Sequence, residues 1–266
     1  MLKPVLFVVC TLCLSFCTDS LAAEDWGTIK GRIVYVGQLP AVQPLEITRD
    51  EDVCGQHKLT DESLIVNREN RGLKNVVVWL YSKKEVPVHP SLQEMPKPAK
   101  LDNKNCRFVP RIVRLRANQT LQAVNSDPVA HNVAVYARRN QPFSVVVPGD
   151  QPLERSFARG ELLPIRVDCS IHAWMRAYLI ITDHPYSAVT DNDGSFTIKN
   201  VPQGEWDFRF WHERPGYLKT LLSKDEKEHK ELSRGTLRIN LNREVDLGDM
   251  KVPEVDFAIE DDSVLR

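Results

Sequence analysis

Three residues with metal-binding side chains lie close together in the second half of the chain. Cys169, His172 and Met175 follow one another at intervals of three and offer a thiolate, an imidazole and a thioether on one short segment. His131, on a separate segment upstream, supplies a second imidazole. Thiolate and thioether favour Cu(I), and imidazole binds both oxidation states of copper, whereas zinc normally takes a closed tetrahedral set without a thioether. These residues therefore predict a site for one copper ion.

The segments around these residues are predicted to be short β-strands. Apolar residues alternate with polar ones, or β-branched residues dominate, in six segments separated by turn-forming residues. The segments are 112–116, 120–124, 143–147, 153–157, 163–167 and 177–182. Several short strands between turns are typical of a β-sandwich. The predicted fold class is therefore all-β, with Cys169, His172 and Met175 in the loop between the last two strands.

From about residue 99 to residue 183 the chain resembles a cupredoxin, the Greek-key β-sandwich of the blue copper proteins. The Cys-x2-His-x2-Met loop is similar to the short ligand loop of amicyanin, and the triplet at 131–133 resembles the first-ligand strand of plastocyanin-like proteins. One difference is that Ile171 and Ala173 stand where prolines often flank the loop histidine. The resemblance implies one type 1 copper. Its equatorial ligands would be His131, Cys169 and His172, with Met175 as the axial ligand.

The resemblance also assigns roles to residues beside the ligands. It implies that Asn132 hydrogen-bonds Ser170, the neighbour of the ligand cysteine, and that this bond holds the two ligand segments together and tunes the copper potential. In the family the loop histidine reaches the surface in an apolar patch where a partner docks. By resemblance, His172 with Trp174 near it would be the point at which electrons enter and leave.

The flanking segments predict a second set of strands. Apolar and polar residues alternate at 27–37, a β-branched run follows at 75–81, and turn-forming pairs at 193–194 and 203–204 bracket a further strand. Together these segments resemble a carboxypeptidase regulatory-like domain, a transthyretin-type β-sandwich. The charged run at 223–231 opens with a Ser-x-x-Glu capping box and predicts a short exposed helix.

The domain organisation follows from these two resemblances. We expect a discontinuous flanking β-sandwich at 27–85 with 186–255, and a cupredoxin-like copper domain at 99–183 inserted into it. Such an insertion is tolerated because the termini of a compact domain often lie close together. The alternative is two consecutive domains at 24–98 and 99–266.

Residues 1–22 are predicted to be a secretory signal. A single lysine precedes the apolar run at 4–16, and the small residues Ser20 and Ala22 predict cleavage after Ala22. The chain would then be periplasmic or secreted, with no transmembrane segment after cleavage. An uncleaved anchor helix and a lipid-modified Cys17 are the alternatives.

The cysteines that remain after cleavage are odd in number. Cys54, Cys106 and Cys169 stay in the exported chain, and an odd cysteine in an oxidising compartment needs a reason. Because Cys169 is assigned to the metal, Cys54 and Cys106 are predicted to form a disulfide. The alternative is that Cys54 and His57 form half of another metal site.

Composition and charge restrict the classes of function. The 266 residues are 42% hydrophobic and 27% charged, which fits a water-soluble protein. Lys and Arg total 35 against 36 Asp and Glu, so the charge gives no basis for binding nucleic acid or an anionic membrane. No glycine-rich phosphate loop, nucleophile elbow or pair of catalytic carboxylates is present in the sequence.

The sequence therefore predicts an exported copper protein that carries single electrons and is not an enzyme. Its partner would be another redox protein, a cytochrome or a dehydrogenase, bound by transient docking. A copper oxidase or nitrite reductase would need a second, histidine-rich copper site. The seven histidines are scattered, at His57, His89, His131, His172, His184, His212 and His229. A copper carrier and a non-redox cell-surface binding module on the same scaffold are the alternative functions.

Overall fold

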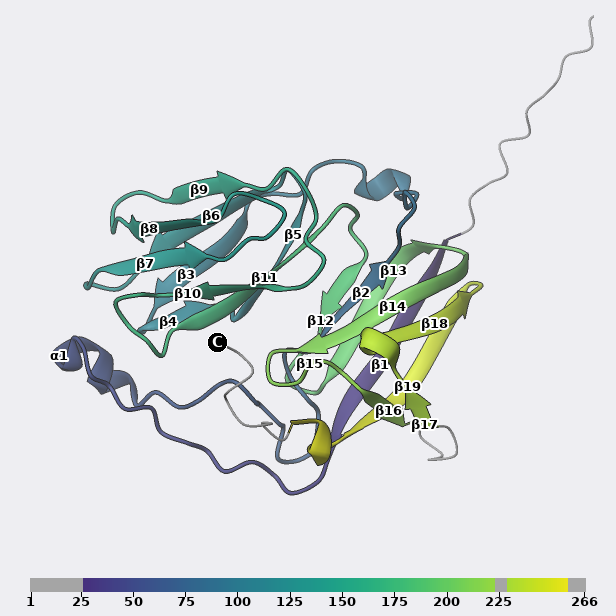
Figure 1. The fold of residues 1–266 in the computed structure, drawn as a ribbon, viewed down its shortest axis with the longest axis horizontal. Helices are drawn as coiled ribbons and strands as arrows, with labels where there is room; N and C mark the ends of the chain where they lie inside the picture. The colour runs from purple at the N-terminus through teal and green to yellow at the C-terminus, as the bar shows by residue number, and fades with distance from the viewer. Residues whose placement is uncertain (1–25, 223–228, 258–266) are drawn as a thin grey trace, which may run out of the picture.

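The computed structural model describes residues 26–222 and 229–257, so the predicted signal at 1–22 lies outside the described residues. In these ranges the regular structure is almost entirely β and forms four sheets, which pair as two sandwiches (Figure 1). The prediction of an all-β fold is confirmed. Within the described residues, no helix is both long and apolar enough to cross a membrane.

The sandwich that carries the predicted metal ligands, termed the inner sandwich, lies between residues 99 and 182. One sheet has the order β5-β11-β10-β7-β8, with bounds Ile112–Arg116, Arg176–Thr182, Ile165–Asp168, His131–Val135 and Phe143–Val147. The other has the order β4-β3-β6-β9, with bounds Arg107–Val109, Ala99–Lys104, Thr120–Asn125 and Leu153–Ser156. Both sheets bury side chains in one core, where Val133, Val167 and Leu179 are inaccessible to solvent. All six strands predicted here are present, to within two residues at either end.

The second sandwich, termed the outer sandwich, also has one shared core, which contains Ile33, Leu80 and Phe208. One sheet has the order β13-β1-β19-β16-β17, with bounds Ser195–Pro202, Trp26–Val36, Glu244–Pro253, Thr220–Leu222 and His229–Glu231. The other has the order β12-β2-β14-β15, with β18 also paired to β14. Its bounds are Ser187–Val189, Val77–Tyr81, Gly204–His212, Gly216–Tyr217 and, for β18, Thr236–Leu241.

The outer sandwich takes strands from both sides of the inner one. β1 pairs with β13 and β19, and β2 pairs with β12 and β14, so early and late segments of the chain share each sheet. Strand pairing of this kind favours the inserted arrangement over two consecutive domains. We therefore keep the division into 99–183 and 27–85 with 186–255 as the proposed one.

The charged run at 223–231 does not form the predicted helix where the structure describes it. Residues 223–228 lie outside the described residues, and His229–Glu231 is strand β17. β17 pairs antiparallel with β16, from Thr220↔Glu231 to Leu222↔His229. The backbone of β16 offers hydrogen-bonding groups at the edge of a sheet, and pairing with them satisfies this segment better than an isolated short helix would.

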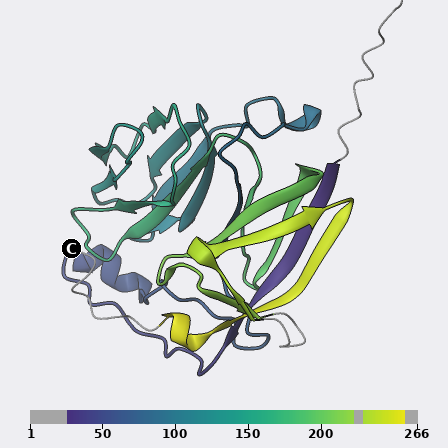
Figure 2. The same ribbon diagram turned by 45° about the vertical axis from the view of Figure 1, so that its right-hand side comes forward.

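A long segment between β1 and β2, residues 38–75 and termed the arm, leaves the outer sandwich and reaches the inner one (Figures 1 and 2). Its outgoing and returning halves lie side by side, and Leu45 N–H of the first half donates to the Leu59 carbonyl of the second at 2.9 Å. Its far end carries helix α1, Glu51–Cys54, followed by the 3-10 turn Gly55–His57. The other 3-10 turns are Pro90–Leu92, Ser233–Gly235 and Glu254–Phe257.

The two sandwiches meet through aromatic rings and a buried ion pair. Tyr178 of β11 and Trp211 of β14 pack edge to face with ring centroids 4.9 Å apart, in a cluster that includes Trp79. Arg111, next to β5, forms a two-pronged ion pair with Glu213, with Nη2 and Oε2 2.7 Å apart. These contacts hold the inner sandwich where the arm can reach it.

Candidate metal centre

The loop with the Cys-x2-His-x2-Met pattern joins β10 to β11. Asp168 pairs with Arg176 at the ends of these strands, and just beyond them Cys169 N–H donates to the Met175 carbonyl at 3.2 Å. Met175 N–H in turn donates to the His172 carbonyl at 2.9 Å. These hydrogen bonds close the loop into a tight turn, so that residues three apart return to the same end of the sandwich.

His131 reaches this end because it is the first residue of β7, which pairs with β10. The donor atoms of His131, Cys169 and His172 all lie within 4.8 Å of one another. Cys169 Sγ is 3.8 Å from His172 Nδ1, and the two imidazole rings have centroids 4.6 Å apart. Both histidines are inaccessible to solvent, and Cys169 and Met175 are 2% and 1% exposed. The 3.8 Å between Cys169 Sγ and His172 Nδ1 suits two donors that share one ion through bonds of about 2.0 to 2.3 Å.

Each histidine has a carboxylate on its far nitrogen. His131 Nε2 lies 2.9 Å from Asp127 Oδ2, and His172 Nε2 lies 2.9 Å from Asp50 Oδ2. A carboxylate only accepts hydrogen bonds, so each Nε2 carries the proton and donates it. The lone pair then lies on Nδ1, the nitrogen that a metal could use.

An unsatisfied buried nitrogen is the strongest sign that the site takes a metal. Within the described part of the chain, His131 Nδ1 is buried and has no hydrogen-bond partner. Leaving a buried polar atom unpaired costs about 1 to 3 kcal/mol, and a metal ion would satisfy it. Burial also lowers the pKa of His131, which keeps the ring neutral and able to bind a metal. The residues present therefore fit a bound copper ion.

Asn132 links the two segments that carry the predicted ligands. Its side-chain oxygen accepts from Ser170 N–H at 2.6 Å, and its Nδ2 donates to Ser170 Oγ at 3.0 Å. Asn132 Nδ2 also lies 3.0 Å from Ser144 Oγ on β8. Because Ser170 follows Cys169 directly, these bonds fix the cysteine backbone against β7, in the place that sequence analysis expected.

The exposure of His172 differs from the sequence-based expectation. His172 was predicted to reach the surface in an apolar patch, but it is fully buried, and Asp50 of the arm lies over its Nε2. Trp174 is partly buried, packs 5.1 Å from the His172 ring, and donates from Nε1 to the Cys106 carbonyl at 3.1 Å. Asp50 of the arm and Trp174 of the loop thus both cover His172.

The predicted disulfide between Cys54 and Cys106 is present, with Cα atoms 5.5 Å apart. It excludes the alternative in which Cys54 and His57 form half of another metal site, because a disulfide sulfur has no thiolate to offer. Cys106 N–H also donates to Asp127 Oδ2 at 2.8 Å. The disulfide therefore adjoins the carboxylate that holds His131, and it attaches the arm to the site.

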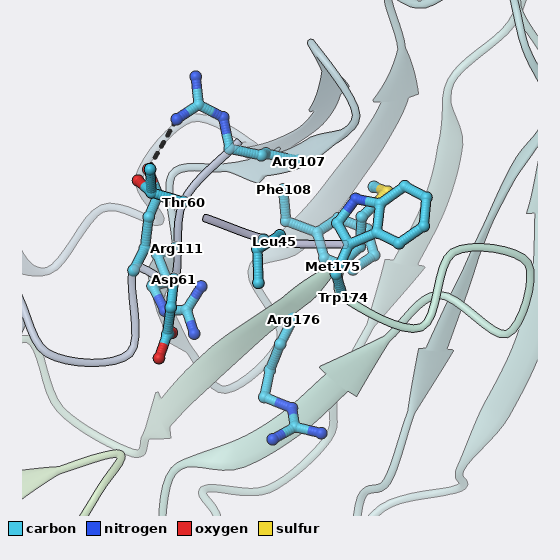
Figure 3. Close-up of a pocket in the computed structure, with 10 residues that line it drawn as sticks. Leu45, Thr60, Asp61, Arg107, Phe108, Arg111, Trp174, Met175 and Arg176 are labelled. Carbon is cyan, nitrogen blue, oxygen red and sulfur yellow. Dashed lines mark hydrogen bonds and ion pairs between the residues drawn. The ribbon is translucent and has the colours of Figure 1, made fainter. Parts of the chain in front are cut away.

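A small pocket adjoins Met175 and Trp174, between the arm and the inner sandwich (Figure 3). Three arginines line it, and each has a carboxylate partner. The pairs are Arg107–Glu62, Arg111–Glu213 and Arg176–Asp168. Each arginine of the pocket therefore has an ion-pair partner within the protein.

Sequence reasoning missed both carboxylates. Asp127 had a weak signal, because it lies four residues before His131 and in a turn. Asp50 had none, because it lies 122 residues from His172 on a segment without a recognisable motif.

Comparisons with known proteins found similarity only among solved structures, each covering between 33% and 40% of this chain. No protein-family model matches the chain, and no curated protein matches its sequence. Amicyanin from Paracoccus versutus is 20% identical over 39% of this chain and 96% of its own, with a TM-score of 0.29. A purple cupredoxin from Nitrosopumilus maritimus is 16% identical over 33% of this chain and 100% of its own, with a TM-score of 0.28. A copper-containing nitrite reductase from Thermus scotoductus is 17% identical over 36% of this chain, with a TM-score of 0.30, and the match spans only 25% of the reductase.

Proposed function

We propose that this chain is a mononuclear copper protein that carries single electrons. The observation that carries the proposal is the convergence of donor atoms from Cys169 and two buried histidines, together with the buried His131 Nδ1, which has no hydrogen-bond partner among the described residues. His131, Cys169 and His172 would hold the ion, with Met175 as the weak fourth ligand. Bound copper would supply the redox step by cycling between Cu(I) and Cu(II).

The protein would contribute a ligand set that is ordered in advance. Asp127 and Asp50 orient the two imidazoles, and Asn132 fixes the backbone beside Cys169. A set held in this way has little freedom to rearrange when the charge of the ion changes. Small rearrangement favours electron transfer over catalysis. In the described ranges, both groups of three or more donor side chains include His131, so we propose one copper ion.

The proposal extends to location and partner. We expect the chain to act in the periplasm or outside the cell, as the predicted signal at 1–22 indicates. Its partner would be a cytochrome or a dehydrogenase that docks transiently, because electron-transfer encounters bury little surface.

Copper binding by the purified full chain tests the proposal. One equivalent of Cu(II) is expected to give an intense blue charge-transfer band and the narrow EPR splitting of a copper thiolate, both bleached reversibly by reductant. The matched control is Cys169→Ser, which should lose the band while retaining the fold by circular dichroism. A colourless wild-type chain with a free thiol would contradict the proposal. Rapid loss of copper to a chelator in both oxidation states would favour a copper carrier.

A further inference from the structure

We propose that Asp50 is a positioning residue of the metal centre. It lies on the arm, which extends from the outer sandwich, and it would cover His172 and lower the reduction potential of bound copper. This inference rests on the proposed function. It concerns a residue outside the inner sandwich, so it gives the arm and the outer sandwich a role in the chemistry of the site.

The first argument is the position of Asp50 between the ligand and solvent. Its Oδ2 accepts from His172 Nε2 at 2.9 Å, and the His172 side chain is 0% exposed while that of Asp50 is 36% exposed. Asp50 is thus accessible to solvent where the imidazole that it contacts is not. A partner or a chelator can reach this carboxylate, whereas the imidazole is fully covered.

The second argument is the local backbone, which is unusual for a helix start. Asp50 precedes α1, where an aspartate normally caps the helix with its side chain, but it forms no such hydrogen bond. Its backbone has φ 48° and ψ 45°, in the left-handed region that aspartate adopts more readily than most residues other than glycine. The carboxylate therefore does not cap the helix and instead accepts from His172 Nε2.

The third argument is that the arm is anchored close to Asp50 on several sides. The disulfide from Cys54 lies four residues beyond it, and the Cys106 carbonyl accepts from Trp174 of the ligand loop. Glu62, on the returning half of the arm, pairs with Arg107 at 2.7 Å. A carboxylate held this firmly keeps its distance from His172 when a metal binds or leaves.

The electrostatic consequence follows from the hydrogen bond. A carboxylate that accepts from the far nitrogen of a ligand histidine makes that ligand more basic and adds negative charge near the ion. Both effects stabilise Cu(II) more than Cu(I). Asp127 acts in the same way on His131 but is itself buried, so Asp50 is the one of the two that solvent and partners can reach.

The test compares Asp50→Asn with Glu51→Gln. Each variant removes one negative charge. Glu51 is an exposed residue of α1 that follows Asp50 in the chain, so Glu51→Gln is the control for loss of charge outside the Asp50–His172 hydrogen bond. The copper-loaded full chains are titrated spectroelectrochemically, and the loss of Cu(II) to EDTA is timed. Asp50→Asn should shift the ratio of Cu(I) to Cu(II) affinity about tenfold towards Cu(I), which is about 59 mV upward for a one-electron couple. It should also lose copper about tenfold faster, whereas Glu51→Gln and the charge-conserving Asp50→Glu should stay nearer to wild type.

The outcomes separate this inference from the proposed function. If wild type forms the blue centre and Asp50→Asn matches Glu51→Gln in potential and copper loss, Asp50 has no such role, and the copper assignment stands. The covering of His172 is tested without metal by NMR of the metal-free chain. The His172 Nε2 proton should exchange slowly in wild type and be lost in Asp50→Ala, and an unchanged signal would overturn the inference even if no copper binds.

Discussion

Removal of the Cys54–Cys106 disulfide should weaken the fold by a predictable amount. The bond closes a loop with a sequence separation of 52 residues, which corresponds to about 4 kcal/mol of unfolding free energy on the loop-entropy relation. Both sulfurs are fully buried in a small cluster with Leu59, so the replacement should be apolar. The double variant Cys54→Ala/Cys106→Ala avoids placing an unpaired polar group there.

Urea titration of the metal-free wild type and double variant measures this loss. The midpoint should fall, and the free energy of unfolding extrapolated to water should drop by about 4 kcal/mol. Cys169→Ala, which removes a buried thiol outside the disulfide, is the control for packing loss. Copper should also leave the double variant faster than wild type, because Asp50 would lose its nearest anchor.

A small loss would refute this reasoning. Suppose that the double variant lost less than about 1 kcal/mol of unfolding free energy. The arm would then be held mainly by its noncovalent contacts. One of these is the partly exposed Glu62–Arg107 ion pair, which contributes at most about 1 kcal/mol. The disulfide would then be dispensable for the position of Asp50.

Three further predictions concern single residues. Asp127→Ala should lower the unfolding free energy by about 3 kcal/mol and the copper affinity at least about tenfold. The reason is that it leaves His131 Nε2 and two backbone N–H groups unpaired. Urea titration measures the first effect, and competition with a chelator measures the second. Burial lowers the pKa of His184 to about 4 and that of His212 to about 3. As the pH falls, these two histidines therefore bind protons in the unfolded chain at a higher pH than in the folded chain. The contribution of these histidines to the free energy of unfolding should therefore be complete above pH 6.5. Below that pH the free energy of unfolding should fall by up to about 1.4 kcal/mol per pH unit for each histidine, down to about pH 4. Urea titrations from pH 7 to 4.5 check this, and a free energy that does not change with pH would contradict it. Asn132→Ala removes both bonds to the ligand loop and should shift the blue band and reduction potential while leaving copper bound, as visible spectra and redox titration would show.

The strands and the ligand loop were accessible from the sequence because their signals are local. Short runs rich in apolar and β-branched residues at 112–116 and 143–147 predict strands, and both strands have the predicted bounds. The spacing of Cys169, His172 and Met175 lies within one hairpin loop, so a short set of backbone hydrogen bonds decides its geometry. The charged run at 223–231 shows the limit of such signals, because its last residues pair with β16 instead of forming a helix.

The sequence by itself determined the all-β fold and the disulfide partners, and it predicted the donor residues, since each depends on residue type and on patterns within a few positions. Only the tertiary structure decided what surrounds the site: that Asp50 covers His172, that Asp127 orients His131, and that neither histidine reaches the surface. Contacts between segments 122 residues apart depend on how the arm packs on the inner sandwich and where the disulfide fixes it. No local pattern of residues encodes that packing, because it is the sum of many weak contacts between separate parts of the chain.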